Sequence, residues 1–217
     1  MARTLLLDLD GTLVDTVPDI AAALNRLMEA RSLAHFTLHE VASMVGDGVA
    51  ALLRKAFAAR GRTQDQSALA DFSADYGAHV AVASRVYPGV RAALHDLADD
   101  GWILAVCTNK PEQAARGLLA AVDLLELVSA VGGGDSFPVR KPDPAHLLLT
   151  LESVGGAVNR TVMLGDHQND IHAAASAGLP GIFAAWGYGT LEQGDCCVAT
   201  AADIWQAVEI AKHLLPP

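Results

Sequence analysis

The stretch LLLDLDGTLVD, residues 5–15, decides how the rest of the chain is interpreted. Its leucines predict a strand buried on both faces, and this strand runs directly into Asp8 and Asp10. Side chains two residues apart in an extended chain point the same way, so the two carboxylates would need a cation or a proton between them. Gly11 lets the backbone approach a ligand closely. The segment fits a nucleophile and an acid that share a metal, and it also fits a strand followed by an Asx turn.

The composition is that of a globular chain without general affinity for polyanions. Of its 217 residues, 52% are hydrophobic and 18% are charged, unlike a disordered chain. The formal net charge of -10 argues against nucleic acid or an anionic membrane as a general partner. No apolar run is long enough for a membrane span, and the first strand pattern begins too early for a signal peptide. We therefore expect a cytoplasmic protein that is a monomer or a weak homodimer.

The order of helical and strand-like patterns predicts two domains. Residues 16–85 contain helical patterns and no strand pattern, as in a small helical bundle inserted after the first strand. From residue 86 onward strands and helices alternate, which predicts a parallel sheet covered on both faces. We expect an α/β, Rossmann-like three-layer core over residues 1–15 and 86–217, with residues 16–85 as a helical-bundle cap.

Polar residues stand at the expected carboxyl ends of four strands, where ligands bind in sheets of this kind. They are Asp8 and Asp10, then Thr108, Asn109 and Lys110, then Lys141 in a loop, and finally Asp166 with Asp170. Magnesium takes oxygen ligands in an octahedral arrangement. We expect Asp8, Asp166 and the backbone carbonyl of Asp10 as its ligands, with Asp170 bound through water or hydrogen-bonded to a ligand.

A phosphate group beside that metal would need positive charge and hydrogen-bond donors. Lys141 would offset the repulsion between a carboxylate and a dianionic phosphate, and Thr108 and Asn109 would donate to phosphate oxygens. Each residue also has a purely structural explanation. Thr108, Asn109 or Asp166 would be able to cap the helix that follows, and Lys141 would be able to lie in a solvated loop. The combination at four strand ends favours one site over four coincidences.

The motifs, in this order, resemble those of the haloacid dehalogenase superfamily of phosphohydrolases over essentially the whole chain. They are DLDGT (8–12), Thr108 in CTNK, Lys141 in RKPDP, and GDHQND (165–170). A helical insertion after the first motif is similar to members with a helical cap. The resemblance implies that Asp8 attacks phosphorus to form an aspartyl-phosphate, while Asp10 protonates the departing alkoxide and then activates water. His167 stands where serine is more common, and we interpret it as a helix-start residue.

Within the superfamily, the chain is most similar to the bacterial phosphoglycolate phosphatases. The supporting stretches are LVDTVPDIAAALN (13–25), MVGDGVAALLRKAF (44–57), GGDSFPVRKPDPAHL (133–147) and DIHAAASAGLPGIFAAWGYG (170–189). The resemblance implies a magnesium-dependent phosphomonoesterase that hydrolyses 2-phosphoglycolate, a small-molecule phosphate ester.

The segment around residues 46–54 offers candidates for recognition of the substrate. As a hypothesis, Arg54 or the loop at Gly46 would contact the substrate carboxylate, with Gly11 beside the phosphate. Asp47 would also be able to cap the helix after that loop. A phosphatase for another small ester or for pyrophosphate, a phosphosugar mutase, a dehalogenase and a catalytically silent binding protein are the alternatives.

Overall fold

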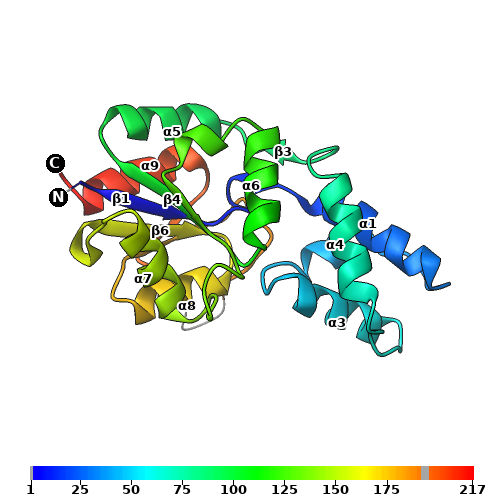
Figure 1. Ribbon diagram of the computed structural model, residues 1–217. Coiled ribbons are helices and arrows are strands. Elements are labelled where there is room, and N and C mark those ends of the chain that lie inside the picture. The colour runs from blue at the N-terminus through cyan, green and yellow to red at the C-terminus, as the bar shows by residue number, and fades with distance from the viewer. Residues whose placement is uncertain (1, 192–195) are drawn as a thin grey trace.

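The computed structural model describes residues 2–191 and 196–217. Its larger part is a six-stranded parallel sheet with helices on both faces, and its smaller part is a group of helices at one end of the sheet (Figure 1). This arrangement confirms the α/β class and the parallel sheet expected from the sequence. No helix in the described ranges has the length and apolar character needed to cross a bilayer.

The opening strand lies at the centre of the sheet, whose strand order is β5-β4-β1-β6-β7-β8. β1 pairs in parallel with β4 on one side and with β6 on the other. The strands are β1 (Thr4–Leu7), β4 (Ile103–Cys107), β5 (Ala130–Gly132), β6 (Thr161–Gly165), β7 (Gly181–Ala184) and β8 (Ala199–Ala201). Because parallel strands end at the same edge, the segments that follow β1, β4 and β6 meet there.

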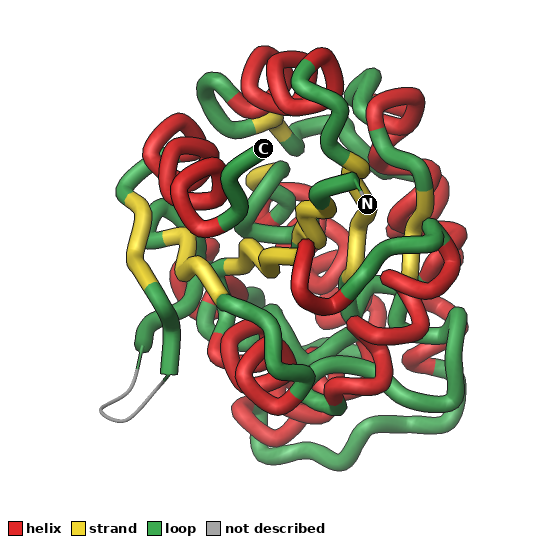
Figure 2. The backbone as a smooth tube through the Cα atoms, turned by 90° about the vertical axis from the view of Figure 1, so that its left-hand side faces the viewer, coloured by secondary structure: helices red, strands yellow, loops and turns green. Residues whose placement is uncertain are grey.

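Both faces of the sheet are buried, which explains the continuous apolar run of β1. Leu5 and Leu7 belong to one apolar cluster, whereas Leu6 belongs to another on the opposite face. Figure 2 shows the row of strands with helices on both sides. The first face is covered by α5 (Val90–Asp99), α6 (Glu112–Ala121) and α9 (Ile204–Leu214), and the second by α7 (Pro144–Ser153) and α8 (Gln168–Ser176). Short 3-10 helices are η1 (Leu125–Leu127) and η2 (Val158–Arg160).

The helices between residues 16 and 85 pack around an apolar core of their own, and we call them the helical unit. They are α1 (Val17–Ala30), α2 (Leu38–Ala42), α3 (Val49–Ala59) and α4 (Ala68–Ala78). Figure 1 shows this unit beside the carboxyl ends of the strands. The helices agree with the patterns found in the sequence, while the division into two domains stays a prediction.

A two-stranded antiparallel ribbon joins the helical unit to the sheet, and the sequence does not predict it. β2 (Val14–Asp15) pairs with β3 (Arg85–Val86), so the two connections lie side by side. Strands of two residues are too short to leave a periodic pattern, and for this reason no strand was expected at residue 85.

Candidate active site

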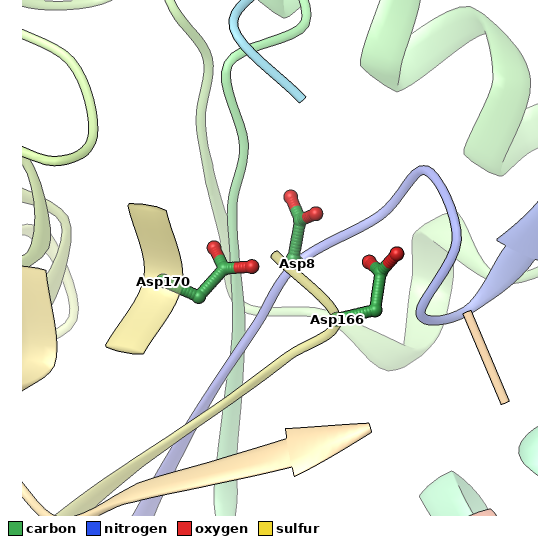
Figure 3. Close-up of side chains that lie close together, drawn as sticks. All are labelled: Asp8, Asp166 and Asp170. Carbon is green, nitrogen blue, oxygen red and sulfur yellow. The ribbon is translucent and has the colours of Figure 1, made fainter. Parts of the chain in front are cut away.

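Three carboxylates meet at the carboxyl end of the sheet (Figure 3). Asp8 follows β1, Asp166 follows β6, and Asp170 lies in the first turn of α8. One oxygen of each lies within 4.8 Å of the others, and all three residues are buried. We call these residues the acidic cluster. Hard oxygen donors at this spacing suit a divalent cation such as magnesium.

Lys141 offsets part of the negative charge of the acidic cluster. Its Nζ donates to Asp8 Oδ1 at 2.8 Å, to Asp170 Oδ1 at 2.6 Å and to the Cys107 carbonyl oxygen at 2.6 Å, which uses all three N–H groups. Burial disfavours its charged form, but Asp170 and Asp8 raise the pKa of Lys141 above its ordinary value. Its side chain is only 2% exposed, so Lys141 is a buried counter-charge of the acidic cluster and not a solvated loop residue.

Repulsion and burial keep two of the carboxylates short of full ionisation near neutral pH. Burial, with the charges of Asp8 and Asp170, raises the pKa of Asp166 to about 8. Burial also raises the pKa of Asp8 to about 6, although Lys141 opposes this shift. A cation bound among these oxygens would relieve the repulsion, so the donor set fits a metal.

Asp166 is oriented by two other loops. Thr12 Oγ1 donates to Oδ1 at 2.8 Å, and the Tyr188 backbone N–H donates to Oδ2 at 2.8 Å. Gly11 has a φ of +87°, and a Cβ there would overlap the Asp166 carboxylate. The glycine of the opening motif is therefore required by Asp166, a reason that the sequence did not reveal.

Asp10 pairs with a different lysine. β1 ends at Leu7, so the alternation expected for a strand does not govern Asp8 and Asp10. Lys110 Nζ donates to Asp10 Oδ1 at 3.0 Å and to Oδ2 at 3.2 Å. Among the described residues, the three-carboxylate group does not include Asp10. Its backbone carbonyl as a metal ligand stays a prediction.

Thr108 and Asn109 reach the same edge of the sheet, but neither caps the next helix, whose N-cap is Pro111. Thr108 is buried, and its Oγ1 accepts from the Lys110 backbone N–H at 3.2 Å. Asn109 Nδ2 donates to the carbonyl oxygens of Gly46 and Lys141, each at 2.9 Å. Asn109 thus ties the helical unit to the core.

A cavity of about 560 Å³ lies between the acidic cluster and the helical unit. From the core, Asp8, Asp10 and Asp166 line it, as do Thr108, Asn109 and Lys110. The helical unit and the segment after it contribute mainly apolar side chains, including Ile20, Val45, Val49, Leu52, Phe72 and Val80. Arg54 is exposed on α3 and is not among the described residues that line the cavity, so the structure does not bring this predicted residue to the site.

Comparison with known proteins identifies the family. Residues 2–178 match the model of the haloacid dehalogenase-like hydrolases. The chain belongs to this family. A phosphoglycolate phosphatase of Cereibacter sphaeroides is 44% identical over 178 residues, which are 79% of this chain and 80% of that protein. One from Caulobacter vibrioides is 43% identical over 85% of this chain and 80% of its own length.

The fold of this hydrolase is also that of solved structures. A predicted phosphoglycolate phosphatase from Haemophilus somnus superposes with a TM-score of 0.89 at 29% identity, covering 96% of this chain and 97% of its own. A structure of CbbY from Rhodobacter sphaeroides with xylulose-(1,5)bisphosphate gives a TM-score of 0.78 at 22% identity, over 94% of this chain and 95% of its own. The expected superfamily and enzyme class are confirmed.

The loop before α3 of this hydrolase is held to the core by a second amide. Asn169 Nδ2 donates to Asp47 Oδ1 at 2.8 Å, and Lys55 Nζ donates to Asp47 Oδ2 at 2.7 Å. Asp47 therefore does not cap α3, whose N-cap is Gly48 without a side-chain hydrogen bond. The predicted Gly46 lines the cavity, where a Cβ would overlap the His167 ring.

His167 is the N-cap of α8, which agrees with its interpretation as a helix-start residue. The ring Nδ1 of His167 accepts from the Asn169 backbone N–H at 3.2 Å, and the backbone N–H of His167 donates to Asp170 Oδ2 at 3.0 Å. Asp166 is therefore not the cap of this helix. The capping box fixes the rotamer of Asp170, whose other oxygen accepts from Lys141.

His146 supports Lys141 and was not identified from the sequence. It is buried near the start of α7, where Nδ1 accepts from the Lys141 backbone N–H at 3.2 Å and Nε2 donates to the Gly133 carbonyl oxygen at 3.1 Å. Burial, with the Lys141 charge, lowers the pKa of His146 to about 4 and keeps it neutral. A histidine five residues after the predicted lysine was the one available signal.

Proposed function

We propose that this hydrolase is a magnesium-dependent phosphatase that cleaves 2-phosphoglycolate to glycolate and phosphate through an aspartyl-phosphate. The observation that carries the chemistry is the meeting of Asp8 with Lys141 and two further carboxylates beside a cavity of about 560 Å³. The substrate follows from relatives that are at least 43% identical over most of their length and are named phosphoglycolate phosphatases.

In the first step, an Asp8 carboxylate oxygen attacks phosphorus, and the bond between phosphorus and the ester oxygen breaks. Asp10 gives its proton to the departing oxygen, so glycolate leaves as the alcohol. In the second step Asp10 takes a proton from water, and the resulting hydroxide attacks phosphorus. Phosphate leaves, and the Asp8 carboxylate is restored.

Asp8, Asp166 and Asp170 would hold the magnesium ion, with the Asp10 carbonyl as a further ligand. When bound, this cation neutralises charge on the phosphate and on the carboxylate that approaches it. Lys141 adds a second positive charge beside Asp8, and Thr108 would donate to a phosphate oxygen.

We further propose that residues 16–85 act as a cap whose Gly46 loop closes the cavity. Asn109 supports this assignment because its two hydrogen bonds join the Gly46 carbonyl to the Lys141 carbonyl. Its amide nitrogen is therefore engaged in positioning the cap and the lysine. Cytoplasmic location and a monomeric or weakly dimeric state stay predictions.

The test is magnesium-dependent phosphate release from a panel of small esters, with p-nitrophenyl phosphate as a generic substrate. We expect 2-phosphoglycolate to have the highest kcat/KM. In Asp8→Asn the rate on every ester should fall by roughly 10⁴-fold or more, because the nucleophile is lost. A different ester at the top of the panel would refute the substrate, and an active Asp8→Asn protein would refute the covalent mechanism.

A further inference from the structure

The part of the cavity that faces the helical unit offers one positive charge to a substrate. Among the described residues that line the cavity, Lys110 is the one lysine or arginine. His167 also lines it, but its Nδ1 accepts a hydrogen bond from the Asn169 backbone N–H at 3.2 Å, and an imidazole that accepts at one ring nitrogen is neutral. Because an unpaired anion is strongly disfavoured beside apolar side chains, Lys110 is the best-suited partner for a substrate carboxylate among these described residues.

Lys110 is held between the core and the helical unit. Its side chain is 5% exposed, its Nζ lies 3.0 Å from Asp10 Oδ1, and the centre of the Tyr76 ring of α4 lies 4.5 Å from the same nitrogen. One wall of the cavity thus carries a buried cation that lies between a carboxylate of the core and an aromatic ring of α4.

The hydrogen bonds of Lys110 leave room for a second acceptor. Its Nζ donates to the two carboxylate oxygens of Asp10, at 3.0 Å and 3.2 Å, and these oxygens lie on one side chain. The Lys110 ammonium has three N–H groups, so it can donate to a second anion while it stays beside Asp10.

We infer that Lys110 binds a second anionic group of the substrate, and that it thereby selects phosphate esters that carry a carboxylate over neutral esters of the same shape. This inference rests on the proposed phosphatase function and specifies its substrate class. It assigns to Lys110 the contact that the sequence suggested for Arg54.

The experiment compares 2-phosphoglycolate with 2-phosphoglycolamide, in which a neutral amide replaces the carboxylate. In Lys110→Met we expect kcat/KM for the acid to fall about 10- to 100-fold, mostly through KM, because one charge-assisted hydrogen bond is lost. The same substitution should lower kcat/KM for the amide by less than about 3-fold, because the amide makes no charged contact with Lys110. Lys110→Arg should restore most of the preference for the acid.

Lys212→Met is the matched control. Lys212 lies on α9, pairs with Asp100 at the end of α5, and is not among the described residues that line the cavity. It should leave the ratio of the two kcat/KM values unchanged. If Lys110→Met lowers kcat/KM for both esters by the same factor, Lys110 only positions Asp10 and the inference fails.

Calorimetric binding separates this inference from the proposed function. In the Asp8→Asn protein, which cannot turn over, we expect tighter binding of the acid than of the amide, and equal binding once Lys110→Met is added. Absence of hydrolysis by the wild-type enzyme would refute the proposed function alone. Equal affinities of Asp8→Asn for the two esters would refute the inference whatever the activity.

Discussion

Lys141 and Lys110 are both buried, and each pairs with one aspartate of the opening motif, yet they face different surroundings. Lys141 Nζ has three acceptors, two of them in the acidic cluster, and is enclosed by the core. Among the carboxylates that the structure describes, Lys110 Nζ pairs with Asp10 alone, and Lys110 lines the cavity beside an aromatic ring of the helical unit.

This difference gives the two lysines different roles, because Lys141 serves the reaction of every ester and Lys110 selects among esters. A lysine whose donors are all taken by fixed groups can neutralise charge for any phosphate ester, but it cannot respond to the rest of the substrate. A lysine at the boundary with the helical unit meets the part of the substrate that varies. Substitutions on the Lys141 side should therefore affect all esters alike, and those at Lys110 should change their ranking.

Of the three changes that test this comparison, Lys141→Met should have the largest effect. It leaves Asp8 and Asp170 without their buried counter-charge, so we expect kcat to fall about 10²- to 10³-fold on every ester. The free energy of unfolding should fall by about 3–5 kcal/mol, as for other broken buried pairs. Steady-state kinetics on the acid and its amide, with urea unfolding, measure both. A loss of kcat on 2-phosphoglycolate alone, with no loss on its amide, would contradict the role given to Lys141 in this comparison.

Magnesium should stabilise the protein more at pH 8 than at pH 5. The raised pKa values of Asp8, about 6, and Asp166, about 8, mean that the folded metal-free protein binds more protons than the unfolded chain, in which a carboxyl titrates near about 3.9. The contribution of these two carboxyl groups to the free energy of unfolding of the metal-free protein is present at low pH and is lost as the pH rises from about 4 to about 8.

A bound cation removes this loss, so the midpoint of thermal unfolding should rise more on adding magnesium to chelator-treated protein at the higher pH. In Asp166→Asn this pH dependence should shrink. Equal shifts at both pH values in the wild type would mean that the acidic cluster is not where the cation binds.

Gly11→Ala should have the smallest effect of the three, and Gly178→Ala is its matched control. Both glycines have positive φ, at +87° and +71°, but only at Gly11 would a Cβ meet Asp166, while nothing lies within 4 Å at Gly178. We expect each to lose about 1 kcal/mol of unfolding free energy from backbone strain. Gly11→Ala should also raise the magnesium concentration for half-maximal activity by about 10-fold. The same increase in Gly178→Ala would contradict this explanation.

Much of this molecule follows from local sequence. The LLL run predicts a central strand because every side chain in it must be buried, and strand-helix alternation from residue 86 predicts a parallel sheet. The polar ends of those strands predict the acidic cluster and Lys141, because parallel strands end at one edge. These features depend on periodicity and on strand direction, which short stretches of sequence carry.

Only the tertiary structure decided which groups pair across the site. It assigned Asp8 to Lys141 and Asp10 to Lys110, connected Asn109 to Gly46, and left Arg54 outside the cavity. These contacts join residues from different loops, whose side-chain directions depend on backbone turns without periodicity. A motif therefore determines which chemical groups reach the edge of the sheet, whereas the packing of loops determines which partner each one meets.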